Sequence, residues 1–301
     1  MLDVAVILIN YNTAKYTLQS IEKVREHTGA DTTCQIIVVD NCSQIADYEH
    51  LKKHFPQHPN ISLYRTPKNL GFGGGNMYGA HYAKASYLLF LNNDAFLQND
   101  CLGILKTYME NQPKAGVTTA QNYDEHGAFV PSFDHNKGLR RLLFGRGFLE
   151  ATHPKRYPKR NREYTQPITV DWVNGAFLFF RTEIFRAIGG FDTNIFLYWE
   201  EMDLCERLRN EGYTAVLVPQ AKITHIQGAS IGSSKAINKE SYISYLYVVK
   251  KHFGIFKYEL IKRYLSLLFL LKKKKRYLRP TIINDNRMEH SLRHKQEEKN
   301  L

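Results

Sequence analysis

The sequence predicts an α/β protein with a mostly parallel β-sheet flanked by helices, followed by a helical, basic C-terminal extension. Short apolar runs rich in β-branched residues alternate with segments of helical periodicity, which is typical of parallel sheets. Polar, turn-forming residues close these runs. With 301 residues, 43% of them hydrophobic, the chain can bury the core of one large domain and carry an appendage.

Four strands are expected first, at residues 4–9, 35–39, 61–64 and 87–91. Thr13 is a suitable N-cap for the helix that separates the first two strands, and its apolar positions have helical spacing. Further helices are expected up to Tyr82 and over residues 100–111. The fourth run is apolar throughout, so we expect a strand that is buried on both faces.

Polar side chains follow three of these strands at the point where each strand ends. The three groups are Asn10, Tyr11 and Asn12; Asp40, Asn41, Cys42 and Ser43; and Asn92, Asn93 and Asp94. Because the carboxyl ends of parallel strands share one sheet edge, we expect these groups to line a single crevice. There Asp94 can hold Mg2+ or Mn2+, which in turn can hold a diphosphate, and the second group can contact a nucleobase or ribose. The alternative is that all three are ordinary polar residues of βα loops.

A glycine-rich segment at residues 69–76 differs from a dinucleotide-binding fingerprint. Counting from Gly71 or Gly73 places Asn76 or Tyr78 where the third glycine belongs, and the segment follows the third strand instead of the first. This argues against an NAD-dependent oxidoreductase. We interpret the segment as a loop whose backbone approaches a ligand, with the next helix N-terminus facing anionic or hydroxyl groups. A flexible linker fits less well, because polar and aromatic residues punctuate the glycines.

The stretch from residue 123 to 166 is basic and has little apolar periodicity. Its cations are Arg140, Arg141, Arg146, Lys155, Arg156, Lys159, Arg160 and Arg162. We expect a long functional loop over the site. Two hypotheses remain open, a solvated basic loop and a role in binding an anionic acceptor.

Another buried strand is expected over residues 168–180, and a cluster of acids begins at Glu200 and Glu201 beside Tyr198 and Trp199. Negative side chains near the start of a helix interact favourably with the helix dipole, which is the structural explanation for this cluster. Alternatively, the aromatic residues form a sugar platform and partly desolvate a carboxylate that acts as a general base on a hydroxyl. His225 ends the last strand-like segment, where both a structural role and a metal-binding role remain open.

The positive charge of the chain lies in its last quarter. Over residues 1–221, 23 Lys and Arg balance 23 Asp and Glu, whereas over residues 222–301 the counts are 18 and 6, which accounts for the net +12. The four cysteines show no disulfide or zinc spacing, and the first residues lack the features of a signal peptide, so we expect a cytoplasmic protein. No apolar run approaches the roughly 20 residues that span a bilayer.

Taken together, these motifs resemble family 2 glycosyltransferases of the GT-A fold, in particular the bacterial rhamnosyltransferases and galactofuranosyltransferases. The resemblance runs from about residue 4 to residue 254. It rests on the ordered set Asn10-Tyr11-Asn12, Val39-Asp40-Asn41-Cys42-Ser43, Asn69-Leu70-Gly71-Phe72-Gly73-Gly74-Gly75-Asn76, Leu91-Asn92-Asn93-Asp94, Trp172-Val173-Asn174-Gly175-Ala176, Tyr198-Trp199-Glu200-Glu201-Met202-Asp203-Leu204 and His225.

The resemblance implies a role for each matching residue. The metal ligands would be Asp94 and His225, and the catalytic base would be Glu201, with Glu200 as the alternative. Nucleotide-binding residues would be Asn10, Tyr11, Asn12, Asp40, Asn41, Asn69, Gly75, Asn76, Asn92 and Asn93, with Asp40 at the nucleobase. The sugar and acceptor pocket would include Trp172, Asn174, Gly175 and Trp199. Two departures matter, because the first acid of the family's DXD motif is Asn92 here, and the base is Glu where Asp is more usual.

The implied enzyme is an inverting, metal-assisted glycosyltransferase with a catalytic domain at residues 1–240. Its donor would be dTDP-rhamnose or a UDP-sugar, and its acceptor a hydroxyl of a surface glycan or a lipid-linked saccharide. The base would remove the proton of the acceptor hydroxyl while Mg2+ or Mn2+ neutralises the departing diphosphate. A pseudo-enzyme that only binds the donor is an alternative.

The extension at residues 241–301 mixes apolar and basic residues at helical spacing up to about residue 279. Such a basic amphipathic helix can lie on an anionic membrane, here the inner face of the cell membrane, where each Lys or Arg contributes about 1 kcal/mol. A solvated helix or a subunit interface is the alternative. A nucleic-acid partner is not expected, because no motif for one is present. Beyond about Pro280 we expect disorder.

Overall fold

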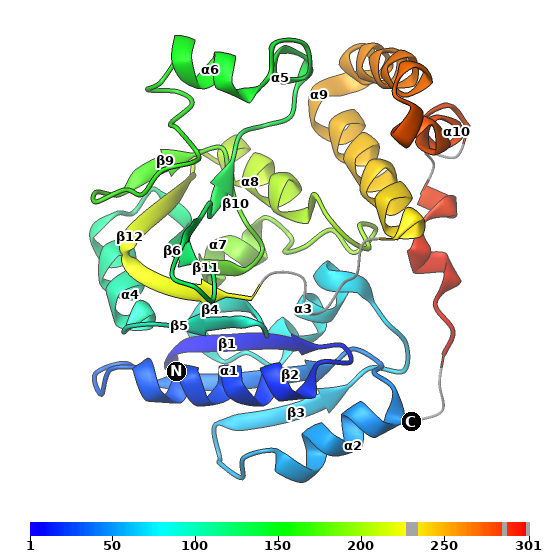
Figure 1. Ribbon diagram of the computed structural model, residues 1–301. Coiled ribbons are helices and arrows are strands. Elements are labelled where there is room, and N and C mark those ends of the chain that lie inside the picture. The colour runs from blue at the N-terminus through cyan, green and yellow to red at the C-terminus, as the bar shows by residue number, and fades with distance from the viewer. Residues whose placement is uncertain (227–233, 285–287, 299–301) are drawn as a thin grey trace.

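The computed structural model describes residues 1–226, 234–284 and 288–298 (Figure 1). A ten-stranded sheet forms its centre, with eight strands in the order β3-β2-β1-β4-β11-β6-β12-β5. The strands are β1 (Leu2–Asn10), β2 (Cys34–Asp40), β3 (Ile61–Arg65), β4 (Ala85–Asn92), β5 (Ala95–Leu97), β6 (Ala115–Tyr123), β7 (Phe129–Val130), β8 (Phe133–Asp134), β9 (Ile168–Val170), β10 (Trp172–Val173), β11 (Phe177–Arg181) and β12 (Thr214–His225).

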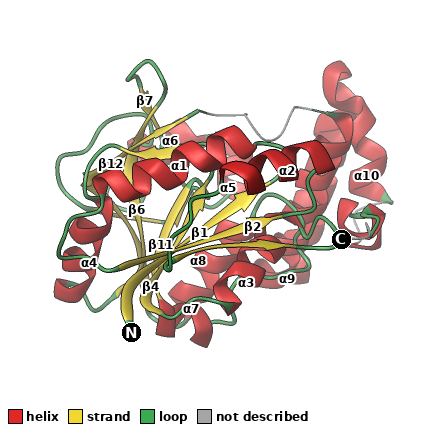
Figure 2. Ribbon diagram, turned by 90° about the horizontal axis from the view of Figure 1, so that it is seen from below, coloured by secondary structure: helices red, strands yellow, loops and turns green. Residues whose placement is uncertain are grey.

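Helices cover both faces of the sheet (Figure 2). They are α1 (Ala14–His27), α2 (Ile45–His54), α3 (Gly71–His81), α4 (Cys101–Asn111), α5 (Leu139–Phe144), α6 (Arg146–Thr152), α7 (Thr182–Ala187), α8 (Glu200–Asn210), α9 (Lys235–Leu271) and α10 (Arg279–Ile283). One core lies between the sheet and α1, α2 and α4, and the other between the sheet and α3, α7 and α8. The central strands are therefore buried on both faces, as the apolar runs predicted.

The sheet confirms the predicted α/β class with a mostly parallel arrangement. Strands β3, β2, β1 and β4 are parallel, and so are β6 and β12. Strand β11 lies antiparallel between β4 and β6, and β5 pairs antiparallel with β12. The expected continuous strand over residues 168–180 is wrong, because Asp171 and the turn at Asn174 divide it into β9, β10 and β11.

Most of the glycine-rich segment is helical, although a loop was predicted: α3 begins at Gly71. Gly71 has φ +76°, and a Cβ there would lie 2.2 Å from the carbonyl oxygen of Phe196. A Cβ on Gly79 would lie 2.6 Å from Ile7 on β1. The glycines therefore allow α3 to approach the sheet and the loop before α8 more closely than side chains would permit.

The basic stretch at residues 123–166 is partly ordered as β7, β8, α5 and α6. Several of its cations form ion pairs inside the chain. Arg141 lies 2.8 Å from Asp134, Arg146 lies 3.3 Å from Glu150, and Arg156 pairs with Asp171. These arginines therefore hold the segment together, which neither sequence hypothesis anticipated.

The C-terminal extension folds back on itself. Helix α9 kinks at Gly254, which has φ +79°, and its second half packs Ile261, Leu265 and Phe269 against Tyr245 of its first half. Two 3-10 helices, η2 (Met288–His290) and η3 (Leu292–Lys295), follow α10 where disorder was expected. In the described part of the chain, no helix is both long and apolar enough to cross a membrane.

Candidate active site

A cavity of about 480 Å³ opens at the carboxyl edge of the parallel strands. The ends of β1, β2 and β4 contribute to it, together with the start of α3, the loop before α8 and the end of β12. Its lining includes Tyr11, Asn41, Asn69, Asn92, Asn93, Asp94, Tyr198 and His225. The size is typical of a site for a small molecule or cofactor. The sequence predicted that three polar groups would meet at one edge of the sheet, and each of them contributes at least one residue to this cavity.

Asn10 and Asp40 lie beneath the cavity and are both fully buried. The side-chain amide of Asn10 donates to Asp40 at 2.9 Å, to Ser43 at 3.1 Å and to Asp47 at 2.9 Å. Asp40 also accepts a hydrogen bond from the backbone amide of Ser43. The structure thus places these two residues in a network that joins β1, β2 and α2, not on the cavity wall where direct nucleotide contact was expected.

Of the other predicted nucleotide-binding residues, some line the cavity and some do not. The Asn41 amide donates to Asn69 at 2.9 Å and to the Gly71 carbonyl at 3.1 Å, which fixes two cavity-lining side chains at the entrance to α3. Asn12 is exposed and accepts a hydrogen bond from the Gln44 backbone amide. Gly75 and Asn76 are buried within α3, and neither lines the cavity.

The two predicted metal ligands lie side by side. Nε2 of His225 is 3.2 Å from a carboxylate oxygen of Asp94, because β12 pairs with β5 immediately after Asp94. Asp94 is only 4% exposed, and the buried amide of Asn93 next to it donates to Thr13 and Thr17 of the first helix region. Both candidate ligands are therefore held in place by the ends of strands.

The donor atoms suit a divalent cation shared with a phosphate ligand. Within the described residues, no cluster of three or more His, Cys, Asp or Glu could enclose an ion by itself. Mg2+ commonly takes one or two carboxylates and completes its shell with substrate phosphates and water. Asp94 fits that pattern, and Nε2 of His225 adds a nitrogen donor beside it. Two protein ligands leave the rest of the shell open, unlike a closed structural metal site.

Glu200 and Glu201 begin α8 but have different surroundings. A carboxylate oxygen of Glu201 accepts a hydrogen bond from the Gly175 backbone amide at 2.8 Å, and the side chain is partly exposed. A Cβ on Gly175 would lie 2.5 Å from that oxygen and 3.3 Å from Phe72, which lines the cavity. Since the carbonyl of the following Ala176 accepts from the Asn92 amide at 3.0 Å, Glu201 is tied to the loop beside the end of β4.

Glu200 is 3% exposed, and its second carboxylate oxygen has no hydrogen-bond partner among the described residues. Burial, with the nearby charge of Glu201, holds the pKa of Glu200 well above its ordinary value. Burial also raises the pKa of Glu201, although the backbone amides of Glu201 and Gly175 oppose the shift. Glu201 therefore combines access, a fixed orientation and a raised pKa, which are the properties of a general base.

The predicted acceptor residues lie next to this helix. Trp172 and Trp199 are 6.3 Å apart between ring centres, and Trp199 also contacts Tyr245 of α9. Asn174 donates its side-chain amide to the Pro131 carbonyl at 2.7 Å. The ammonium of Lys137 lies 5.1 Å from the Trp199 ring, and burial lowers the pKa of Lys137 to about 8. This aromatic cluster lies at the start of α8, and neither its two tryptophans nor Glu201 are among the residues that line the cavity at the sheet edge.

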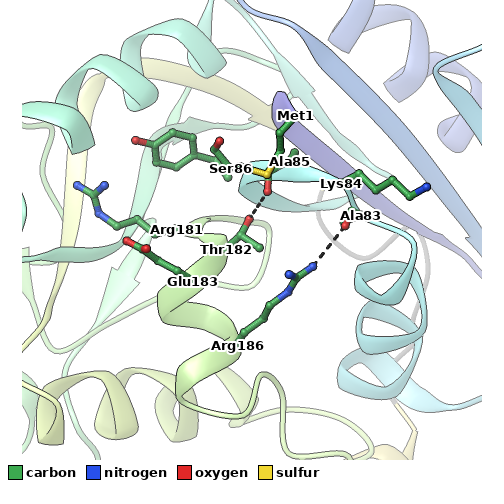
Figure 3. A pocket seen from close by; sticks show the side chains of 10 residues that line it. Met1, Ala83, Lys84, Ala85, Ser86, Arg181, Thr182, Glu183 and Arg186 are labelled. Atoms are coloured by element: carbon green, nitrogen blue, oxygen red, sulfur yellow. Dashed lines mark hydrogen bonds between the residues drawn. The ribbon is translucent and has the colours of Figure 1, made fainter.

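A second hollow of about 590 Å³ lies at the opposite, amino edge of the sheet (Figure 3). Its lining includes Met1, Lys84, Arg181, Glu183 and Arg186. The polar contacts drawn there go to backbone, since Thr182 donates to the Ala85 carbonyl at 2.8 Å and Arg186 to the Ala83 carbonyl at 3.4 Å. None of the predicted site residues lies there.

Sequence reasoning missed two groups of residues. Thr17 and Asp47 join the network below the cavity, and the spacing of Thr13 and Thr17 by one helical turn could have indicated the first of them. Leu292 and Gln296, near the end of the chain, also line the cavity. No local signal in the sequence connects them with the carboxyl edge of the sheet.

Known structures show the same fold. GalNAc-T7, crystallised with UDP, GalNAc and Mn2+, matches 93% of this chain and 54% of its own, with a TM-score of 0.62 and 16% identity. The mannosyltransferase PcManGT of Pyrobaculum calidifontis, in complex with GDP-Man and Mn2+, matches 94% of this chain and 75% of its own, with a TM-score of 0.56 and 14% identity. The fold is that of the GT-A glycosyltransferases.

The sequence profile described as Glycosyl transferase family 2 matches residues 5–189, and this chain belongs to that family. It is a glycosyltransferase. The rhamnosyltransferase WbbL of Escherichia coli (strain K12) is 29% identical over 234 residues, which cover 74% of this chain and 83% of WbbL. The N-acetylglucosaminyl-diphospho-decaprenol L-rhamnosyltransferase of Mycobacterium tuberculosis (strain ATCC 25618 / H37Rv) is 26% identical over 219 residues, which cover 66% of this chain and 70% of that protein.

Proposed function

We propose that this glycosyltransferase moves a sugar, with inversion, from a nucleotide-diphosphate donor to a hydroxyl of a lipid-linked saccharide. The observation that carries the proposal is the position of Glu201, fixed by the Gly175 amide in the loop that bonds to Asn92 beside Asp94 and His225. A base held beside a diphosphate site is what a single displacement requires. dTDP-rhamnose is our first choice of donor, supported by relatives named as rhamnosyltransferases, and UDP-sugars are the second.

In this proposal Glu201 accepts the proton of the acceptor hydroxyl as the oxygen attacks the anomeric carbon. Asp94 and His225 hold Mg2+ or Mn2+, and such an ion, when bound, neutralises charge on the departing diphosphate. Asn41 and Asn69 shape the nucleoside end of the cavity, and the buried pair Asn10 and Asp40 keeps their strands in register. No covalent sugar intermediate is required.

The acceptor side is proposed to lie against an anionic membrane. Exposed apolar residues on the second half of α9 include Phe256, Leu267 and Leu271, with exposed fractions of 75%, 59% and 71%, and Lys272, Lys273, Lys274 and Lys275 follow them. Helix α5, which presents exposed Leu143 and Phe144, is joined to α9 by a hydrogen bond from Tyr264 to the Leu142 carbonyl at 2.8 Å. Figure 1 shows α5, α6 and this half of α9 at one end of the molecule.

Such a surface suits the headgroup region of a bilayer, where a lipid-linked acceptor resides. The predicted amphipathic helix contributes its exposed side only, since its other side is packed on the rest of the chain. Sedimentation with vesicles of phosphatidylglycerol or phosphatidylcholine tests the surface. Binding to the anionic vesicles should fall with Phe256→Ser and Leu271→Ser, and dimerisation without vesicle binding would favour a subunit interface.

A donor screen tests the catalytic proposal. Thermal stabilisation and slow hydrolysis should be followed for dTDP-, UDP- and GDP-sugars with Mg2+ or Mn2+, for the native chain and for Asp94→Ala. We expect one donor to stabilise the native chain, and Asp94→Ala to lose the metal-dependent part of that effect and about 1,000-fold of the turnover, because several kcal/mol of charge stabilisation depend on the ion. Lys114→Ala, an exposed change before β6, is the matched control. If no nucleotide sugar binds with any metal, the proposal is wrong.

A further inference from the structure

Two of the last described residues of the chain line the cavity. We call residues 291–298 the C-terminal strap. Figure 1 shows this end of the chain, in red, running along one side of the molecule from α10 toward α2 and α3. Within the strap, Leu292 and Gln296 line the cavity, whereas Arg293, His294 and Lys295 between them are exposed. The strap therefore turns one side toward the site and the other toward solvent.

Buried and charged contacts hold the strap in place. Ser291 is fully buried and donates its hydroxyl to Glu240 of α9 at 2.7 Å, and the backbone amide of Leu292 donates to the same carboxylate at 2.8 Å. Glu240 is itself only 1% exposed. A buried carboxylate with two donors from one segment is a costly arrangement that persists only if the segment stays docked.

Two further contacts tie the strap to segments that line the cavity. Arg293 donates to the Asn194 side chain at 2.8 Å, in the loop that continues to the cavity-lining Phe196 and Tyr198. Glu298 pairs with Lys68 at 3.0 Å, directly before Asn69. The strap is thus joined both to the loop before α8 and to the segment before α3, where Asn69 and its partner Asn41 line the cavity.

We propose that the C-terminal strap is the outer wall of the donor site, and that Leu292 and Gln296 bind the nucleoside half of the donor. This rests on the proposed function, since a diphosphate at Asp94 and His225 leaves the base and ribose to extend toward Asn41 and Asn69. Leu292 offers an apolar surface to the base or ribose, and the Gln296 amide offers hydrogen-bonding groups. The Gln296 side chain already donates to the Leu292 carbonyl at 2.9 Å, which pre-organises the two together.

Equilibrium binding of free dTDP and UDP by isothermal titration calorimetry, with donor KM and kcat, tests the strap. Variants are Leu292→Ala, Gln296→Ala, and a chain ending at Asn284, and Lys295→Ala is the control on the exposed side. We expect the shortened chain to lose about tenfold in nucleotide affinity and to raise donor KM by a similar factor, with kcat nearly unchanged. The two point variants should each lose about threefold, and the control should match the native chain.

The outcomes separate this proposal from the one on which it rests. If the native chain binds a nucleotide and the point variants bind it equally well, the strap does not contact the nucleoside and the proposal is wrong. Tighter binding by the shortened chain also overturns it, because the strap would then obstruct the site. If the native chain binds no nucleotide, the donor site itself is wrong. Circular dichroism melting shows whether the shortened chain is folded, and the point variants decide the question if it is not.

Discussion

The two hollows at opposite edges of the sheet are similar in volume, about 480 Å³ at the carboxyl edge and about 590 Å³ at the amino edge. They differ in how far their polar and charged side chains are exposed to solvent. At the amino edge Lys84, Glu183 and Arg186 are exposed. At the carboxyl edge Asn93 and Asp94 are nearly inaccessible, at 3% and 4% exposure.

This difference has an energetic meaning. An exposed charged side chain costs little, whereas a buried polar group without its hydrogen bonds costs about 1–3 kcal/mol. The carboxyl edge contains several buried polar side chains, and other strands and helices supply the hydrogen-bond partners that avoid this cost. The comparison teaches that volume alone does not identify a site, and that buried polar groups held at strand ends do.

The largest expected effect tests the chemical difference between the two acids of α8. Glu201→Gln should lower kcat by about 100- to 10,000-fold, since it removes the proposed base while keeping the size of the side chain. Glu200→Gln should lower it far less. Because the pKa of Glu201 is raised, the acid limb of the pH–rate profile should lie above the ordinary value of 4.5 for Glu. A greater loss with Glu200→Gln would assign the base to Glu200 instead.

The same pair makes a prediction about stability. Burial raises the pKa of Glu200, so the folded state keeps a proton that the unfolded state releases in the window just above pH 4.5. The free energy of unfolding should therefore fall as pH rises through that window. Glu200→Gln should remove this part of the pH dependence and raise the melting temperature at neutral pH, measured by circular dichroism.

A smaller effect is expected from the network below the cavity. Asn10→Ala should lower the free energy of unfolding by about 2–3 kcal/mol, because it removes the buried amide that donates to Asp40, Ser43 and Asp47 together. Urea unfolding measures this loss, with Lys15→Ala on the exposed side of α1 as the control. A loss of donor binding with unchanged stability would instead mean that Asn10 contacts the nucleotide directly.

Local patterns in the sequence predicted the sheet and most of the cavity. An apolar run that ends in Asn92, Asn93 and Asp94 specifies both a buried strand and the polar groups at its end, so these residues could be placed without coordinates. His225 could be assigned to the same edge because it ends a strand. Both inferences use only residues that are neighbours in the chain.

The features that escaped prediction depend on contacts between distant segments. Whether Asp40 faces the cavity or lies beneath it depends on Asn10 and Arg65, which belong to other strands. The glycines of α3 favour a loop by their intrinsic propensity, and they are helical here because the helix packs closely against Ile7 and Phe191. The C-terminal strap is held by Glu240 and Lys68, and the ion pair of Lys68 with Glu298 joins residues 230 positions apart.

The smallest expected effect tests the amino edge. Arg186→Ala removes an exposed guanidinium whose contact with the Ala83 carbonyl is long, at 3.4 Å, so the free energy of unfolding should change by about 0.5 kcal/mol or less. Donor KM and kcat should match those of the native chain, because no side chain of this hollow reaches Asp94, His225 or Glu201 among the contacts of the described residues. A tenfold loss of activity in a folded variant would mean that the amino edge contributes to function, and the contrast between the two edges would then fail.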